Sequence, residues 1–235
     1  MASGSVQPAF LFDLDGVVVD SNALHVDSWK AVARRHGFAC PDPDHIGKCG
    51  LRTRAVIRDL LRWPVTDAEA DRIGFEKEEL YREWIRAGGI PAIPGVLEFL
   101  AAARRLGIPC AVGSSAPREN VDLCLQALGL GTAFRATVSG ADVARGKPAP
   151  DIFLKAAAAL GAAPAECLVF EDAPAGIAAA HAAGMRAWAL LTSHSREELA
   201  DADAIAPDFR GLEPQAVQAA WTPREPPRPP PRAGA

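Results

Sequence analysis

The sequence predicts an α/β fold in which helices cover both faces of a parallel sheet and an α-helical cap is inserted after the first strand. Short apolar runs alternate with segments of helical periodicity through most of the 235 residues, which is typical of such a sheet. Between about His25 and Ala87 the pattern is helical and contains no convincing strand. A helical block at this point in the chain indicates an inserted cap.

Five apolar runs are the predicted strands. The first, Ala9–Phe12, stops at Asp13, and a short run of this kind is consistent with a strand buried on both faces. The later runs are Pro109–Gly113, Ala136–Val138, Cys167–Phe170 and Arg186–Leu191. The helices predicted between them are Gly95–Leu106, Glu119–Leu128, Asp151–Leu160 and Ala175–Ala183. This alternation assigns residues 9–24 and 92–215 to the core domain.

The cap is predicted to span residues 25–91. Thr66 and Glu69 form a capping box, in which a hydroxyl begins the helix and a carboxylate follows three residues later. The helix that starts there is expected to run almost to the end of the cap. Hinges are expected near residues 21–25 and 88–94, where the chain passes between core and cap.

Composition argues against several classes of partner. The formal net charge is −4, and no basic stripe indicates a nucleic-acid partner. No apolar run approaches transmembrane length, and residues 1–8 lack the pattern of a signal peptide, so no membrane partner is expected. The five cysteines are scattered and form no CxxC pair, which fits a reducing compartment. We therefore expect a cytoplasmic protein, either a monomer or a weak homodimer.

Both ends of the chain are expected to lack fixed structure. Residues 1–8 are mostly small and polar, and we expect a flexible N-terminus. Residues 222–235 read TPREPPRPPPRAGA, and their prolines favour an extended, disordered tail. A binding site for a proline-reading domain is the alternative for this tail.

Asp13 and Asp15 are the first candidate catalytic residues along the chain. They follow the first predicted strand, at the edge where open α/β sheets bind ligands, and Gly16 allows a sharp turn there. A carboxylate can attack phosphorus, and a second carboxylate can supply the proton that the departing alkoxide needs. The alternative is that both aspartates only mark the end of a strand.

Parts of a phosphate site follow at other strand ends. Ser114, with nearby backbone N–H groups, suits phosphate oxygens, and Lys147 offers an ammonium group. Glu171 and Asp172 end another strand, where Asp172 together with Asp13 would make an oxygen-rich seat for Mg²⁺. Each segment alone has an ordinary alternative, as a helix cap, a surface lysine or a loop start. Their joint occurrence at strand ends favours metal-assisted phosphoryl transfer.

Four motifs carry a resemblance to a known family. They are FDLDG (residues 12–16), GSS (113–115), GKPAPD (146–151) and FEDAPAGI (170–177). With them, the chain resembles the haloacid dehalogenase superfamily of phosphotransferases, in the subgroup that contains β-phosphoglucomutase and small-molecule phosphatases. The resemblance covers roughly residues 10–212 and implies a Rossmann-like core with a mobile helical cap.

The resemblance also implies roles for individual residues. Asp13 would be the nucleophile and Asp15 the general acid and base, while Ser114 would hold the phosphate and Lys147 would steady the nucleophile and the phosphate. Relatives that cleave carbon–halogen bonds lack an acid at the position of Asp15, because a departing halide needs no proton. The presence of Asp15 therefore favours phosphate esters as substrates.

The same resemblance implies a Mg²⁺ site. Asp13, Asp172 and the backbone carbonyl of Asp15 would be its ligands, and Glu171 would hold a metal-bound water.

The cap and the segment after Ser114 are expected to bind the substrate. His25 matches the position of a histidine at the active-site mouth of related enzymes, and Gly50 and Arg52 lie in a sequence similar to the loop that reaches over the substrate. Ser115 and Arg118 are the expected contacts from the core. A polar hinge residue is the alternative for His25, and an ordinary surface charge is the alternative for Arg52.

We therefore expect a Mg²⁺-dependent phosphatase that hydrolyses a small phosphorylated metabolite, such as a sugar or polyol phosphate, through an aspartyl-phosphate. A β-phosphoglucomutase-type mutase is the first alternative. Similar mutases supply a hydroxyl and a lysine just after the serine, whereas this chain has Ala116 and Pro117 there. A non-catalytic binding or regulatory protein is the second alternative, and the presence of Asp13 and Asp15 argues against it.

Overall fold

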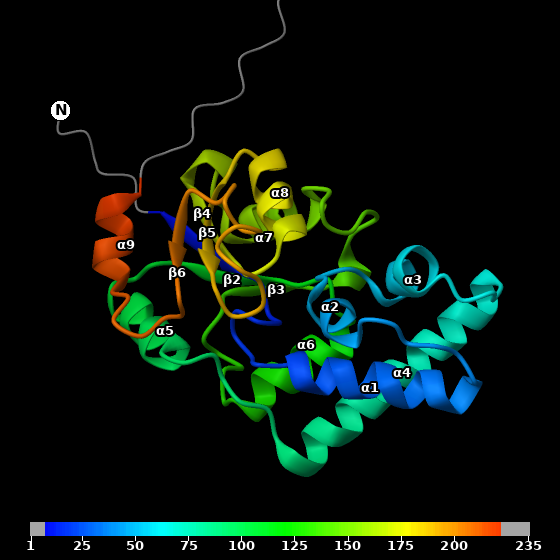
Figure 1. Cartoon of the computed structure of the whole chain (residues 1–235). Helices are drawn as coiled ribbons and strands as arrows, with labels where there is room; N and C mark the ends of the chain where they lie inside the picture. Colours follow the sequence, from blue (N-terminus) through cyan, green and yellow to red (C-terminus); the bar gives the residue numbers. More distant parts are fainter. Residues whose placement is uncertain (1–7, 222–235) are drawn as a thin grey trace, which may run out of the picture.

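The computed structural model describes residues 8–221 and contains a parallel six-stranded sheet in the order β3-β2-β1-β4-β5-β6 (Figure 1). The strands are β1 (Ala9–Phe12), β2 (Cys110–Gly113), β3 (Ala136–Val138), β4 (Cys167–Glu171), β5 (Arg186–Leu190) and β6 (Ala204–Ala206). The expected α/β fold is confirmed, and β6 is a strand that the sequence analysis missed. Our expectations for residues 1–7 and 222–235 concern parts of the chain outside the described residues.

Helices cover both faces of the sheet because successive side chains of a strand point to opposite sides. Phe10 and Phe12 pack on one face, whereas Ala9 and Leu11 pack on the other. The first face is covered by α5 (Val96–Arg105), α6 (Arg118–Ala127) and α9 (Pro214–Ala220), and the second by α7 (Asp151–Leu160) and α8 (Pro174–Ala182). Two 3₁₀ turns lie at Gly140–Asp142 and Pro164–Glu166. The central strand β1 is thus buried on both faces, as its apolar run predicts.

The cap is a helical layer beside the core (Figure 1). It consists of α1 (Asn22–His36), α2 (Pro43–Lys48), α3 (Thr53–Ala55), which continues as a π-helical segment (Val56–Leu61), and α4 (Asp67–Gly88). Trp29, Ile57 and Ile73 belong to a hydrophobic cluster of its own. The capping box of Thr66 and Glu69 begins α4, as predicted.

The last turns of α4 leave the cap's own cluster and join the core. Tyr81 and Ile85 are 1% and 2% exposed and pack with residues of the sheet and of α5 and α6. The cap therefore stays attached to the core through the C-terminal half of α4, and its limits at residues 25 and 91 remain a prediction. None of the helices within residues 8–221 has the length and apolar character needed to cross a membrane.

Candidate active site

Asp13 and Asp15 lie where β1 ends, at the centre of the sheet's edge. The backbone N–H of Asp13 donates to the carbonyl of Phe170 at 3.0 Å, which extends the pairing of β1 with β4 by one residue. The chain then turns at Gly16, whose φ is +72°. A methyl group on Gly16 would lie 1.8 Å from Oδ2 of Asp172. Glycine therefore serves both the turn and the close approach of this carboxylate.

A buried ion cluster joins three strand ends. Lys147 Nζ lies 2.9 Å from Asp13 Oδ1 and 2.5 Å from Glu171 Oε1. The other oxygen of Glu171, Oε2, accepts hydrogen bonds from the backbone N–H groups of Asp172 (2.7 Å) and Ala173 (2.9 Å). Both oxygens of Glu171 are therefore occupied by partners from this chain.

The cluster carries an excess of negative charge. Asp13, Glu171, Asp172 and Lys147 are each 5% exposed or less, and three carboxylates face one ammonium group. Burial, together with the neighbouring carboxylates, raises the pKa of Asp13 to about 7 and raises that of Asp172 well above its usual value. Burial disfavours the charged form of Lys147, but Asp13 and Glu171 outweigh it and raise the pKa of the lysine. Another cation would relieve the repulsion between the carboxylates.

The donor set fits Mg²⁺. Ligand oxygens of Asp13, Glu171 and Asp172 all lie within 4.8 Å of one another. Magnesium prefers hard oxygen ligands and is usually held by one or two carboxylates. Because Lys147 and two backbone N–H groups already occupy Glu171, Asp13 and Asp172 are the carboxylates best placed to hold the ion.

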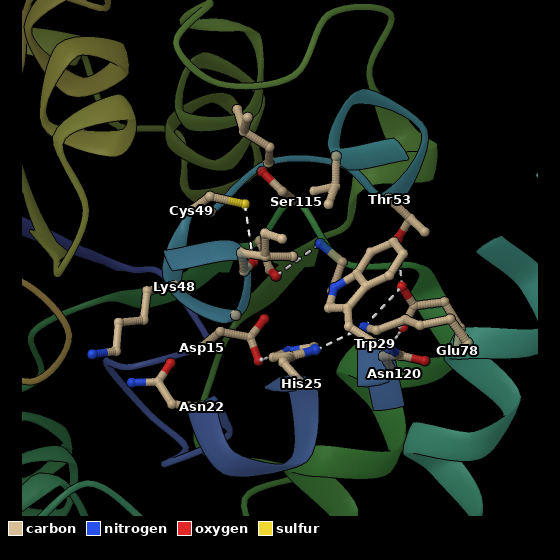
Figure 2. Close-up of a pocket in the computed structure, with 18 of the residues that line it drawn as sticks. Asp15, Asn22, His25, Trp29, Lys48, Cys49, Thr53, Glu78, Ser115 and Asn120 are labelled. Carbon is tan, nitrogen blue, oxygen red and sulfur yellow. Dashed lines mark hydrogen bonds and ion pairs between the residues drawn. The ribbon is translucent and has the colours of Figure 1, made fainter. Parts of the chain in front are cut away.

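The hydrogen-bond donors around Asp15 all approach the same oxygen of its carboxylate. Oδ1 accepts from Ser21 Oγ at 2.6 Å and from Tyr81 Oη at 3.5 Å. It also lies 3.1 Å from Nε2 of His25, a contact that Figure 2 shows. The imidazole of His25 stacks on the ring of Tyr81 with centroids 4.4 Å apart. Burial would raise the pKa of Asp15, but His25, Ser21 and Lys77 together lower it to about 2.

Lys77, which the sequence analysis did not select, fixes the tautomer of His25. Its Nζ lies 2.7 Å from Nδ1 of His25. A lysine ammonium group only donates, so Nδ1 is the acceptor and Nε2 carries the proton. The imidazole therefore donates from Nε2 to Asp15, which holds the carboxylate of Asp15 in place.

Next to Lys77, three buried side chains join the cap to the core. They are Glu78, Asn120 and Arg82, and we call them the interdomain clamp. Asn120, on core helix α6, donates from Nδ2 to Glu78 Oε2 at 2.7 Å and accepts at Oδ1 from Arg82 Nη1 at 2.6 Å. Glu78 and Arg82 lie one turn apart on α4 and are 6% and 4% exposed. Glu78 also accepts from Thr53 and pairs with Lys77 at 3.3 Å.

Most of the predicted site residues line one cavity between cap and core. Figure 2 shows this cavity. Its volume is about 60 Å³. The predicted residues in its wall are Asp13, Asp15, His25, Gly50, Ser114, Ser115 and Asp172. Lys147 and Glu171 lie outside this wall; Lys147 contacts Asp13, and Glu171 contacts Lys147. Ser114 is 1% exposed, and its hydroxyl accepts from the N–H of Ala116 at 3.1 Å.

Arg52 and Arg118, which we expected to contact the substrate, are not among the residues that line this cavity. Arg118 donates to Thr137 Oγ1 at 2.8 Å and pairs closely with Asp142, both in the core. Arg52 donates from Nη2 to the carbonyl of Val143 at 2.9 Å and from Nη1 to that of Ala144 at 3.2 Å. Partners within the chain therefore occupy Nη1 and Nη2 of both guanidinium groups, whereas Nε of Arg52 is buried without a hydrogen-bond partner among the described residues.

One sequence signal was available for Lys77. It lies four residues after Ile73 and four before Tyr81, so it falls on the buried stripe of α4. A lysine on such a stripe requires a buried partner, but the sequence alone does not say that His25 and Glu78 supply it. Asn120 carried no comparable signal, because its partners come from the other domain.

Comparison with known proteins identifies the family. The profile of haloacid dehalogenase-like hydrolases matches residues 8–184, which hold Asp13, Lys147 and Asp172. The chain belongs to the haloacid dehalogenase-like hydrolases. The resemblance inferred from the four sequence motifs is thereby confirmed.

Relatives within this family include named phosphatases and a mutase. The chain is 33% identical to validoxylamine A 7'-phosphate phosphatase of Streptomyces hygroscopicus subsp. limoneus, over 85% of this chain and 92% of that protein. It is 36% identical to hexitol phosphatase A of Escherichia coli K12, over 83% and 88% of the two chains. The crystal structure of β-phosphoglucomutase from Clostridium difficile superposes with a TM-score of 0.80 at 25% identity, over 91% and 96% of the chains.

Proposed function

We propose that the protein is a Mg²⁺-dependent phosphatase that hydrolyses the monophosphate of a small polyhydroxylated metabolite through a phosphorylated Asp13. The observation that carries this proposal is the joint position of Asp13 and Asp15. Asp13 is part of a buried, negatively charged cluster with Lys147, and Asp15 faces the same cavity with one oxygen held by donors. One carboxylate is thus suited to attack and the other to proton transfer.

In the first step, a carboxylate oxygen of Asp13 attacks phosphorus, the P–O ester bond breaks, and the alcohol leaves with a proton from Asp15. Lys147 keeps the carboxylate of Asp13 oriented through their ion pair. Ser114 and Ser115 line the same cavity, so the hydroxyl of Ser114 and the N–H of Ser115 can donate to phosphate oxygens. In the second step, Asp15 removes a proton from water, which attacks the phosphorus and regenerates Asp13. Inorganic phosphate is the second product.

The contacts of Asp15 assign different tasks to its two oxygens. Ser21, His25 and Tyr81 all approach Oδ1, so Oδ2 is the oxygen best suited to carry the transferred proton. With a pKa of about 2, Asp15 is ionised near neutral pH, so its carboxylate is free to accept a proton in the second step. A phosphate dianion bound beside it would raise this pKa, because like charges favour the neutral form, and so prepare the acid of the first step.

Asp13, Asp172 and the carbonyl of Asp15 would hold Mg²⁺. The bound ion would supply positive charge between the nucleophile and the phosphate oxygens. Glu171 would support the same site indirectly. Its carboxylate accepts hydrogen bonds from Lys147 Nζ and from the backbone N–H of Asp172.

The lining of the cavity supports water as the phosphoryl acceptor in place of a second phosphorylated sugar. Ala116 and Pro117 are part of this lining and offer neither a hydroxyl nor an ammonium group. Lys77 also lines the cavity, but His25 and Glu78 hold its ammonium group. Lys48 extends away from His25 in Figure 2. Lys77 is thus engaged within the chain, and the support for water rests on Ala116 and Pro117.

The remaining lining is suited to neutral hydroxyl groups. Trp29 and Leu51 provide apolar surface, and Asn22 and Ser115 provide polar atoms. The relatives named for validoxylamine phosphate and hexitol phosphate support the same substrate class. We therefore place sugar and polyol monophosphates first among candidate substrates.

A panel of sugar and polyol monophosphates, assayed for inorganic phosphate with Mg²⁺, tests this function. We expect phosphate release without a bisphosphate activator. Conversion of β-glucose 1-phosphate to glucose 6-phosphate with little phosphate release would instead make the protein a mutase. The Asp13→Asn variant serves as the matched inactive control, because an amide cannot form the acyl phosphate.

A further inference from the structure

Arg52 links the cap to the core loop that carries Lys147. It lies just before α3 in the cap, and its guanidinium group donates to the carbonyls of Val143 and Ala144, about ninety residues away in the chain. The stem of Arg52 also packs on Gly146: a methyl group there would lie 3.0 Å from Nε and 3.3 Å from Cδ of the arginine. These contacts tie the cap to a segment that ends at an active-site residue.

The segment held by Arg52 is also anchored to the core, because Val143 packs against the hydrophobic core and Lys147 is held by Asp13 and Glu171. The N–H of Arg145 donates to Asp151 at 3.3 Å, and the N–H of Ala149 donates to the carbonyl of Gly146 at 3.0 Å. Both bonds are local, within the loop and the start of α7. Arg52 is therefore the contact from the cap that holds the carbonyls of Val143 and Ala144, next to Lys147.

The chemistry of this contact suits repeated release. The acceptors are neutral carbonyls, so Arg52 gains less than it would from a carboxylate in the same place. Arg145 in the same loop, by contrast, is paired with Asp151. The bond of Arg52 to Ala144 is exposed to solvent and its bond to Val143 is partly buried, whereas the interdomain clamp of Glu78, Asn120 and Arg82 is buried. A buried contact at one side and a partly exposed contact to neutral carbonyls at the other side resemble a pivot and a latch.

We propose that Arg52 is the latch of the cap: it closes the cap on the 143–147 loop in each turnover and thereby positions Lys147. In this role Arg52 is a positioning residue that does not touch the substrate. The cap pivots at the interdomain clamp and opens where Arg52 leaves the carbonyls of Val143 and Ala144. Closing of the cap and ordering of the lysine loop are then one event.

Hydrogen exchange of the full-length protein with Mg²⁺ tests this proposal without a substrate. In Arg52→Ala, we expect amides of residues 143–149 and of the cap segment 47–53 to exchange at least about tenfold faster than in the wild type, because two charge-assisted hydrogen bonds are lost. Arg54→Ala is the matched control, since Arg54 pairs with Asp71 within the cap and is half-exposed. Its exchange in these segments should equal that of the wild type.

A second variant removes the contact from the other side. The atoms nearest to a methyl group on Gly146 all belong to Arg52, so Gly146→Ala should loosen the latch while Arg52 is still present. In a double-mutant cycle, Gly146→Ala should accelerate exchange in the wild type but add nothing in Arg52→Ala, because the two residues act through one contact. Additive effects, or exchange in Arg52→Ala within about twofold of the wild type, would overturn the latch.

The kinetic readout separates this proposal from the proposed function, on which its turnover argument rests. With an active phosphatase, Arg52→Ala should lower kcat at least as much as it changes KM, because it affects closure and not substrate contact. A rise of KM alone would assign Arg52 to substrate binding instead. If the wild type releases no phosphate, the proposed function fails, but the exchange experiment still decides whether Arg52 latches the cap.

Discussion

Gly16→Ala is the substitution whose effect follows most directly from the geometry. Gly16 has φ of +72°, and an added methyl group would lie 1.8 Å from Oδ2 and 2.5 Å from Cγ of Asp172. The carboxylate of Asp172 must therefore move. Gly37 provides a matched control, because its φ is +69° and nothing lies within 4 Å of an added methyl group.

The two variants share a backbone penalty but differ in the site. An alanine in the left-handed region costs about 1–2 kcal/mol, so both variants should lose this much unfolding free energy. Only Gly16→Ala displaces Asp172, and we expect its apparent affinity for Mg²⁺ to fall by about 10- to 100-fold. Gly37→Ala should keep the wild-type affinity.

Urea unfolding and titration of phosphate release with Mg²⁺ measure these two effects separately. The decisive quantity is the difference in Mg²⁺ affinity between the two variants, because the common backbone penalty cancels. Equal Mg²⁺ affinities for Gly16→Ala and Gly37→Ala would refute the assignment of Asp172 to the metal site.

Further predictions concern the metal, the buried lysine and the interdomain clamp. Chelation should stop phosphate release and Mg²⁺ should restore it. Full activity in excess chelator would show that the reaction does not need the metal. Lys147→Met should lose most of kcat and about 3–5 kcal/mol of unfolding free energy, because buried carboxylates lose their counter-ion; a variant as stable as the wild type in urea would contradict this. Asn120→Leu leaves Glu78 and Arg82 without the amide that bonds to both, so urea unfolding should show a loss of about 3–5 kcal/mol of unfolding free energy. The control Gln126→Leu, on the exposed side of α6, should stay within about 0.5 kcal/mol of the wild type.

The central strands could be predicted because their signal is local. Ala9–Phe12 is apolar at every position, and all four residues are buried. In β6, Ala204–Ala206, the three residues are only partly buried and lie at the edge of the sheet. A short, half-exposed edge strand has neither a long apolar run nor a clear alternation, so the sequence pattern did not reveal it.

The candidate site was predictable where each residue follows a strand in a parallel sheet. Such strands end at the same edge, so Asp13, Ser114 and Asp172 come together once the sheet is recognised. The cap side was not predictable in this way, because its contacts depend on how two layers of helices meet. Lys77 therefore stayed unrecognised, and the neighbours of Arg52 became visible only with the fold.

A burst experiment with p-nitrophenyl phosphate tests the central claim most directly. Nitrophenolate is a good leaving group that needs no proton, so phosphorylation of Asp13 should proceed without an acid, whereas hydrolysis of the acyl phosphate still needs a base. We predict steady turnover by the wild type and no nitrophenolate from Asp13→Asn. Asp15→Asn should give a burst stoichiometric with enzyme and leave the mass of one phosphoryl group on the peptide that contains Asp13. Turnover by Asp13→Asn, or a phosphoryl group on another residue, would contradict the account.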